Sequence, residues 1–164
     1  MKRAFARKVA FATLSQTGIG YPRSTLARNL PGAPRGAPRA GDRFPWLRVA
    51  FRPGGPIEDL FQRLDDTRFN LVLVGQPLPE RGVQGLGDDL LRVHAIAEDA
   101  RNARELAKAR LGGGPAFYLL RPDGHVGLAG GRFDAVAIYD YLVDCGVRLE
   151  SEPARASTVT LRAA

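Results

Sequence analysis

The stretch Phe117–Gly130, FYLLRPDGHVGLAG, most constrains the fold of this chain. Phe117–Leu120 is an apolar run without alternation, which is typical of a strand covered on both faces. Arg121–Gly124 supplies a tight turn, because proline presets φ, aspartate caps its own backbone and glycine accepts the left-handed position. In the strand that follows, we expect Val126 and Leu128 to share one face. The stretch therefore predicts a β-hairpin.

Strand and helix signals alternate along the rest of the chain. They predict a strand over Phe44–Phe51, a short helix over Pro56–Leu64, strands over Phe69–Val74 and Leu90–Ile96, a helix over Ala100–Leu111 and, after the hairpin, a helix over Asp134–Cys145 capped by Asp134. The run FNLVLV at 69–74 is the strongest strand signal and favours the centre of a sheet. Because the order β-α-β-β-α-β-β-α with right-handed crossovers covers apolar strands with helices, we expect an α/β sandwich with a mixed central sheet.

The positive charge of the chain is concentrated near its amino terminus. Residues 1–43 contain nine Lys and Arg side chains and one acidic side chain, a net charge of +8, whereas residues 44–164 have a net charge of −1. Residues 22–42 contain four prolines and three glycines, a composition typical of a linker that builds no packed element. We therefore predict a basic amino-terminal helix and linker at 1–43, a domain at 44–150 that folds without this arm, and a tail at 151–164.

The arm and the composition limit the classes of partner. A basic arm attracts nucleic acid or an acidic membrane surface, but it is also typical of a solvated segment in an arginine-rich protein, and we prefer the second interpretation. No aromatic side chain lies between Arg23 and Arg43 to stack on bases, which argues against nucleic acid. No apolar run has the length of a membrane helix, and the single cysteine fits a reducing cytoplasm.

The closing β-β-α pattern, preceded by Gly114-Pro115, resembles the end of a thioredoxin-like fold. That resemblance implies a cis Gly114–Pro115 peptide bond opposite an active-site loop. In thioredoxins the catalytic Cys-x-x-Cys follows the central strand, and here the corresponding residues, 75–80, are GQPLPE. Without a cysteine at this position the chain has no dithiol with which to attack a disulfide. We therefore expect a thioredoxin-like sandwich that lacks the CxxC motif.

Three other side chains are candidates for a catalytic or metal-binding role. Cys145 is predicted at the carboxyl end of the last helix beside Asp144, where the helix dipole and the carboxylate both disfavour a thiolate. His94 and His125 each lie on a predicted strand, without the spacing of a metal site. His125 could form an acid–base pair with Asp123, but the turn already uses that aspartate. The sequence predicts no catalytic residue and no metal ligand; the alternative is a one-cysteine, peroxiredoxin-like oxidoreductase that uses Cys145.

The segment Gly41–Pro45, GDRFP, invites comparison with the Gly-Asp motif that holds FAD in flavin hydroxylases. That motif continues with Ala-His, Pro and Gly-x-Gly, whereas this chain lacks the histidine and the downstream glycines. A Gly-x-Gly-x-x-Gly fingerprint after a strand is also missing from the sequence. We therefore expect the chain to bind neither FAD nor another nucleotide by itself.

Three segments together resemble one known family. They are SQ at 15–16 with Tyr21 and STL at 24–26, then AGDRFP at 40–45, then LLRPDGHV at 119–126. In this order and spacing they resemble the carboxy-terminal region of FAD-dependent aromatic hydroxylases, the phenol and polyketide hydroxylases. The resemblance covers residues 15 to 146 and implies a thioredoxin-like domain without redox cysteines. It carries over no catalytic residue, because none of the matched motifs is catalytic.

In that family an FAD domain and a substrate domain precede this region, and this chain has neither. It therefore resembles a detached terminal module, and we predict a non-catalytic function: dimerisation, or docking to a protein partner. FAD would belong to that partner or to a parent enzyme. An amphipathic helix expected at 2–14 would have no catalytic domain to pack on, which also favours a homodimer or a partner complex.

Overall fold

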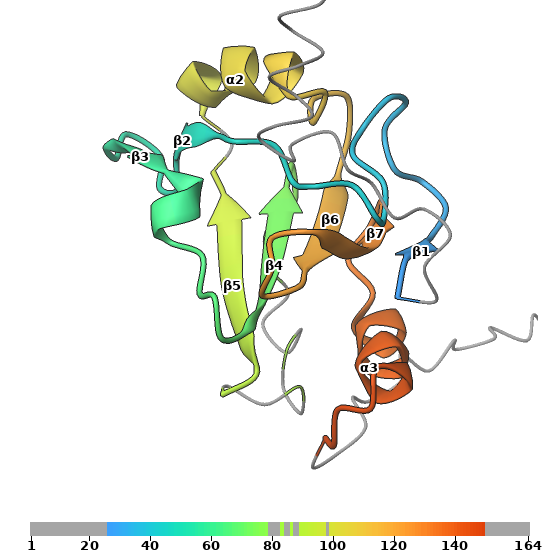
Figure 1. Ribbon diagram of the computed structural model, residues 1–164. Coiled ribbons are helices and arrows are strands. Elements are labelled where there is room, and N and C mark those ends of the chain that lie inside the picture. Colours follow the sequence, from blue (N-terminus) through green and yellow to red (C-terminus); the bar gives the residue numbers. More distant parts are fainter. Residues whose placement is uncertain (1–25, 79–82, 84–85, 87–88, 98, 150–164) are drawn as a thin grey trace, which may run out of the picture.

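A five-stranded mixed sheet lies at the centre of the protein. The computed structural model describes residues 26–78, 83, 86, 89–97 and 99–149, and these form an α/β fold with that sheet, a two-stranded ribbon and two α-helices (Figure 1). In sheet order the strands are β1 (Arg28–Asn29), β7 (Val126–Gly130), β6 (Ala116–Leu120), β4 (Phe69–Val74) and β5 (Leu91–Ile96). β4 and β5 run parallel, as do β1 and β7, whereas β6 is antiparallel to both of its neighbours. The predicted α/β class and mixed sheet are confirmed.

Strands β4 and β6 form the buried centre of the sheet, as their unbroken apolar sequences predict. All residues of β6, and all residues of β4 except Phe69, are buried. The bounds of β4 are those predicted, while β5 begins one residue later than predicted and β6 one residue earlier. The short-range signals for these three strands are therefore reliable.

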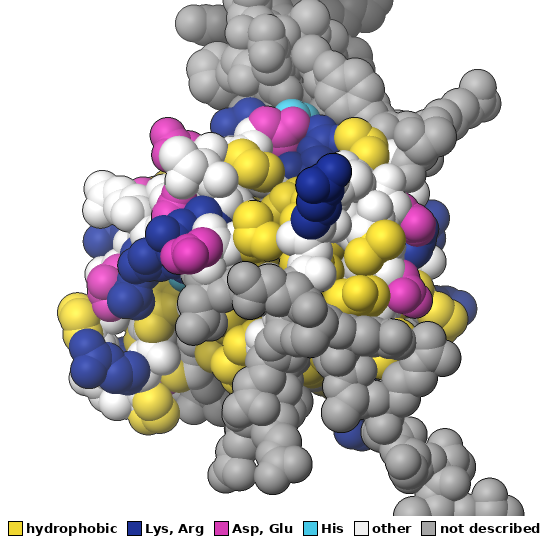
Figure 2. Space-filling model, turned by 90° about the horizontal axis from the view of Figure 1, so that it is seen from below, with side chains coloured by type: hydrophobic (Ala, Val, Ile, Leu, Met, Phe, Trp, Pro, Cys, Tyr) yellow, Lys and Arg dark blue, Asp and Glu magenta, His cyan; other side chains and the backbone are white. Residues whose placement is uncertain are grey.

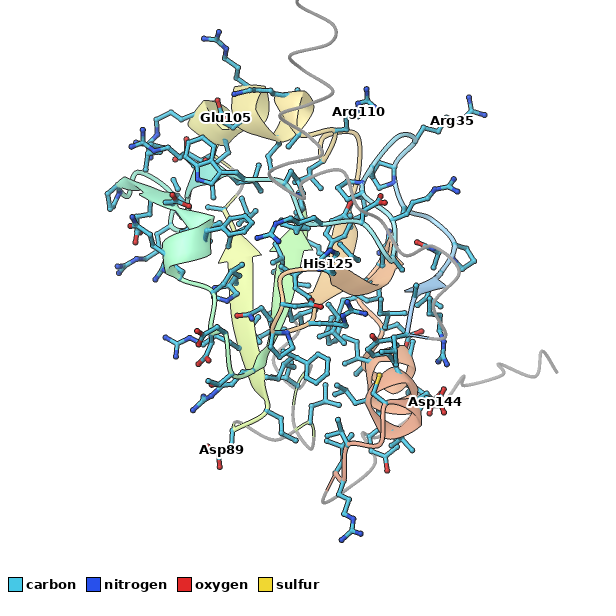
Figure 3. The ribbon with its side chains drawn as sticks, in the orientation of Figure 1. Arg35, Asp89, Glu105, Arg110, His125 and Asp144 are labelled. Carbon is cyan, nitrogen blue, oxygen red and sulfur yellow. The ribbon has the colours of Figure 1, made fainter. Side chains whose placement is uncertain are left out.

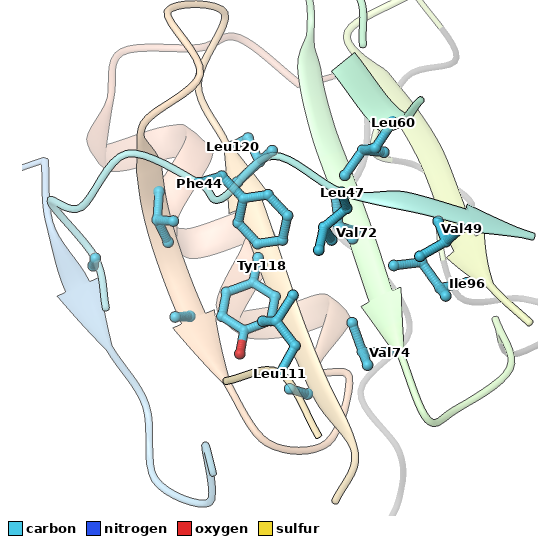
Figure 4. Packing of buried hydrophobic residues seen from close by; sticks show 14 residues of the cluster. Phe44, Leu47, Val49, Leu60, Val72, Val74, Ile96, Leu111, Tyr118 and Leu120 are labelled. Carbon is cyan, nitrogen blue, oxygen red and sulfur yellow. The ribbon is translucent and has the colours of Figure 1, made fainter. Parts of the chain in front are cut away.

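Apolar layers cover both faces of the sheet. On one face Phe44, Leu47 and Leu111 pack over Val72 and Tyr118, and the Phe44 and Tyr118 rings lie 5.2 Å apart between centroids (Figure 4). Leu106 of helix α2 (Ala103–Lys108) adds to this layer. On the other face, helix α3 (Ala135–Asp144) packs against Leu71, Phe117 and Leu128 through Ile138, Tyr141 and Leu142. The sheet is therefore covered by α3 on one side and by loops, the ribbon and α2 on the other.

Helix α3 begins at the predicted cap and packs closely on β7. The Asp134 side chain accepts the Ala137 N–H at 3.0 Å, as an N-cap should. Tyr141 reaches β7 where Gly127 leaves room for it: a Cβ added to Gly127 would lie 2.1 Å from the Tyr141 hydroxyl oxygen. The helix can approach the sheet this closely because residue 127 has no side chain.

A β-bulge in the β6–β7 hairpin changes the expected faces of β7. Leu119 pairs with Leu128, but Leu120 pairs with Val126, so β7 carries one extra residue at Gly127. Val126 consequently packs in the cluster that contains Tyr118, and Leu128 packs in the opposite cluster. The prediction that Val126 and Leu128 share a face is wrong, because the inserted residue resets the alternation.

The helix predicted over Pro56–Leu64 is also wrong. This region contains strand β3 (Ile57–Asp59) and the 3₁₀ helix η1 (Leu60–Gln62), and β3 pairs antiparallel with strand β2 (Arg48–Ala50). Between the two strands, Gly55 N–H donates to the Arg52 carbonyl oxygen at 2.9 Å and closes a turn. A turn placed directly before the segment brings β2 within pairing distance, so strand pairing prevails over the helical periodicity. The strand predicted over Phe44–Phe51 is correspondingly shortened to β2.

Part of the predicted linker belongs to the packed fold. β1 pairs with β7, and Leu30 N–H continues the pairing by donating to the Ala129 carbonyl oxygen at 2.7 Å. The Asn29 side-chain oxygen accepts the Ala40 N–H at 2.9 Å, and Ala40 is 1% exposed. The expectation that this proline-rich segment builds no packed element is therefore wrong from Arg28 onward. Sheet pairing stabilises it where its own composition does not.

The amino-terminal helix and the carboxy-terminal tail predicted from the sequence lie outside the described residues. Within the part of the chain that the structure describes, no helix is long and apolar enough to cross a lipid bilayer.

Candidate functional site

Gln76 lies directly after β4, at the position that corresponds to the Cys-x-x-Cys of thioredoxins. Its side-chain oxygen accepts the Phe133 N–H at 2.9 Å, and its side-chain nitrogen donates to the Gly131 carbonyl oxygen at 3.0 Å. Both ends of the carboxamide are thus bonded to the segment that joins β7 to α3. Gln76 fastens two loops together, and a carboxamide held in this way offers no nucleophile.

The Gly114–Pro115 segment lies against this loop, but its peptide bond is trans. A Cβ on Gly75, which has φ of 61°, would lie 3.4 Å from the Gly114 carbonyl oxygen, so the two loops are neighbours as expected. The described residues contain no cis peptide bond, and the prediction of a cis bond before Pro115 is wrong. Gly113 and Gly114 instead reverse the chain with φ values of 114° and 148°, which glycine adopts without steric penalty.

A small apolar cavity of about 280 Å³ lies between these loops and α2. Val74, Leu106, Leu111 and Pro115 supply most of its side-chain lining. Asp99 also lines it, but that carboxylate is bonded to the Arg101 side chain and backbone and to Gly54 N–H, and these bonds lower its pKa. The cavity therefore presents apolar surface and a carboxylate already committed to a local turn.

Cys145 lies far from this cavity, at the carboxyl end of α3. Its preceding residue, Asp144, is at the opposite end of the molecule from α2 and well apart from His125 in Figure 3. Cys145 is half-buried, and its N–H donates to the Tyr141 carbonyl oxygen at 3.0 Å as part of the helix end. The structure does not bring this thiol together with the loop after β4 or with His125.

His94 lies on β5 and is buried with Asn70 of β4. Asn70 Oδ1 accepts the Asp65 N–H at 2.9 Å, and Asn70 Nδ2 donates to the Asp65 and Arg68 carbonyl oxygens, so the orientation of this amide is determined by its bonds. His94 Nε2, 3.1 Å from Asn70 Oδ1, must therefore be the donor. Burial, followed by the charges of Arg63 and Arg92, lowers the pKa of His94 to about 4. The neutral ring ties β5 to β4.

His125 and Asp123 form part of the predicted turn. The carboxylate of Asp123 accepts the His125 N–H at 3.0 Å, lies 3.3 Å from His125 Nδ1 and pairs with Arg121 at 2.6 Å. Although burial acts against it, the hydrogen bonds from Arg121 and the His125 backbone lower the pKa of Asp123. Gly124 N–H closes the turn by donating to the Arg121 carbonyl oxygen at 2.9 Å. The turn is confirmed, and these contacts give Asp123 a structural role.

Two of the segments compared with the hydroxylases, residues 40–45 and 119–126, lie side by side. Gly41 N–H donates to the Val126 carbonyl oxygen at 2.7 Å, and Val126 N–H donates to the Asp42 carbonyl oxygen at 2.9 Å. The Asp42 carboxylate accepts the Arg39 N–H at 2.8 Å. The Gly-Asp segment therefore forms a structural joint with the start of β7, and its carboxylate caps its own turn.

A surface groove of about 860 Å³ runs beside β5 and was not anticipated from the sequence. Its lining residues come from three segments: Phe51 and Arg52, Gln62 to Asp66, and Arg92 to Ala95. The signal that could have indicated it is the mixture of Arg92 and His94 with apolar residues in LRVHAI, which is typical of an edge strand. Among the described residues, no group of three or more His, Cys, Asp or Glu side chains is arranged to hold a metal ion.

No protein-family model matches the chain, and no curated protein matches it. A function is therefore inferred from the residues and contacts described above.

Proposed function

We propose that this chain is a non-catalytic, thioredoxin-like module that binds protein and is related to the carboxy-terminal domain of FAD-dependent aromatic hydroxylases. The observation that carries the proposal is the position of Gln76. Directly after the central strand, where a thioredoxin would need a nucleophile, this side chain joins two loops through hydrogen bonds to Phe133 and Gly131.

Two further observations support a thioredoxin-like arrangement. The fold closes with β6, β7 and α3, the β-β-α ending named above, and the loop after β4 packs against Gly114–Pro115. The hydrogen bonds of Val126 with Gly41 and Asp42 also join the segments 40–45 and 119–126, both of which contribute to the resemblance. The trans bond before Pro115 departs from the thioredoxin pattern. It fits a module in which no substrate is held opposite cysteines.

The proposed activity is dimerisation or docking to a partner protein. FAD belongs to that partner or to a parent enzyme, and the chain itself binds none. The cytoplasm, which the single cysteine favours, is part of the same proposal.

The direct test is flavin binding combined with the mass of the protein in solution. The purified chain should be colourless, and after incubation with excess FAD it should elute from gel filtration without flavin absorbance. Sedimentation should give either a dimer or, with native lysate, a complex whose second protein is identified by mass spectrometry. Stoichiometric FAD that survives gel filtration would overturn the proposal.

The enzymatic alternative makes a different prediction for Cys145. Cys145→Ser should leave any peroxide or disulfide turnover of the preparation unchanged, because the thiol lies at the far end of α3 from the loops after β4 and before β6. Turnover that disappears in this variant, and in no variant of Gln76, would favour a one-cysteine oxidoreductase instead.

A further inference from the structure

We propose that the outer edge of β5 binds an extended acidic segment of a partner protein, which adds to the sheet as a further strand. This inference depends on the proposed protein-binding function and gives it a surface and a partner chemistry.

The outer edge of β5 is unpaired in the part of the sheet that the structure describes. It is the last strand in the sheet order, and among the described residues it forms a ladder only with β4. Phe69 N–H of β4 donates to the Leu90 carbonyl oxygen at 3.0 Å. In a parallel ladder every second residue faces the neighbouring strand, so the N–H and C=O groups of Val93 and Ala95 point outward.

Ala97 supports this assignment independently. It continues the same alternation beyond the end of β5, and its N–H donates to the Ala50 carbonyl oxygen at 3.3 Å, on the side away from β4. The ribbon strand β2 thus already uses the outer edge at this one point. Between Ala97 and the start of β5, no other described strand pairs with this edge.

The groove beside this edge has the shape of a site for an extended chain. Four consecutive β5 residues, Arg92 to Ala95, line the 860 Å³ groove. Successive side chains of a strand point to opposite faces of the sheet, so four in a row can border one groove only along the strand's edge. The bordered length of about 13 Å suits a short extended peptide. The segment Gln62 to Asp66 forms the other wall.

Basic side chains outnumber acidic ones in the lining of the groove. Arg52, Arg63 and Arg92 line it, and Arg63 also pairs with Glu58 at 3.5 Å. Of its two carboxylates, Asp65 accepts bonds from Thr67 and pairs with Arg68 at 3.4 Å, which leaves Asp66 as the opposing charge. Figure 2 shows Lys/Arg and Asp/Glu side chains gathered at the left of the view, on the side where β5 and β3 lie in Figure 1. The lining is therefore basic and favours acidic side chains in the ligand.

The same charges argue against a second copy of this chain as the occupant. Pairing two β5 edges would place two basic grooves, each lined by Arg52, Arg63 and Arg92, against one another, and the repulsion between like charges disfavours this. A partner segment with Glu or Asp on alternate residues would instead place its carboxylates beside these guanidinium groups and its backbone beside Val93 and Ala95.

The test uses the full chain and a fluorescent decapeptide of alternating Glu and Val. Anisotropy should show binding that weakens with salt, and amide hydrogen exchange should show new protection at Val93 and Ala95. Arg92→Glu should weaken binding about tenfold, whereas Arg35→Glu, the same charge change at an exposed site far from β5, should alter it by less than about twofold (Figure 3). Arg63→Glu provides a second variant if Arg92→Glu unfolds.

Two control peptides separate strand addition from charge attraction. A Lys and Val peptide should not bind, and the Glu and Val peptide methylated on every second backbone nitrogen should bind at least about tenfold more weakly, because it loses its ladder donors. The proposal is overturned by absence of binding, by equal binding of either control, or by protection that appears elsewhere. Concentration-dependent dimerisation that protects Val93 would assign the edge to a second copy. A partner or dimer that forms without these residues would leave the proposed function intact and refute this inference alone.

Discussion

The carboxamide of Asn102 pairs with the backbone of Ala50 as a neighbouring strand would. Its oxygen accepts the Ala50 N–H at 2.8 Å, and its nitrogen donates to the carbonyl oxygens of Ala50 and Ala97 at 2.9 Å each. Asn102 is 1% exposed, so these bonds are made away from water. One side chain at the end of the 3₁₀ helix η2 (Ala100–Asn102) thereby joins the ribbon to the end of β5.

Replacing Asn102 with Ala should lower the free energy of unfolding by about 2 to 3 kcal/mol, because the buried Ala50 N–H loses its acceptor and the carbonyl oxygens of Ala50 and Ala97 each lose one hydrogen bond. Urea unfolding measures this directly. Asn29→Ala is the control: it removes one part-buried hydrogen bond, from the Ala40 N–H, and should cost less, about 1 kcal/mol. Equal losses in the two variants would contradict the importance assigned to the Asn102 pairing.

Gly127→Ala should destabilise the fold by about 2 kcal/mol, because the new Cβ would overlap the Tyr141 ring, whose hydroxyl is held by a hydrogen bond to the Leu26 carbonyl oxygen. Thermal unfolding compared with Gly112→Ala provides the control, since a Cβ on Gly112 would meet its nearest atoms at 3.7 Å. In a Tyr141→Leu background the cost of Gly127→Ala should shrink. An unchanged cost would mean that the strain arises elsewhere.

Stability should fall as the pH drops from about 6.5 toward 4, by up to about 3 kcal/mol from His94 alone. The pKa of His94 is lowered from 6.5 to about 4 by burial and by Arg63 and Arg92, so in this window the unfolded chain takes up a proton that the folded chain does not. His94→Gln keeps a donor for Asn70 without titrating. The difference in the free energy of unfolding between the unmodified protein and His94→Gln, measured at pH 7 and at pH 5, isolates the contribution of His94. An equal difference at the two pH values would exclude this contribution.

Removing residues 1–40 should lower the melting temperature by more than removing residues 1–25. The difference reports on residues 26–40, which supply β1 to the edge of β7 and the Asn29–Ala40 hydrogen bond. The loss of strand pairing and of buried Ala40 should cost about 2 kcal/mol or more. Two deletions of equal stability would instead support a domain that begins near residue 44, as the composition predicted.

Signals carried by neighbouring residues were sufficient for the centre of the fold. Unbroken apolar runs placed β4 and β6, Pro122-Asp123-Gly124 placed the turn, and Asp134 marked the start of α3, because each depends on residues within a few positions of one another. The sequence also showed that no cysteine follows β4 at residues 75–80. This is why a non-catalytic, protein-binding function is proposed.

Partners distant in the sequence decided the rest. Ile57–Asp59 form a strand because they pair with β2, and residues 28–29 form a strand because they pair with the edge of β7. The bulge at Gly127 reversed the expected faces of β7, and the basic groove beside Val93 arose from three separate segments. The periodicity of apolar residues predicts which face of a segment is buried. Whether the segment forms a paired strand depends on which distant segment lies beside it in the fold. The tertiary structure alone therefore determined both the path of residues 26–43 and the edge proposed to bind a partner.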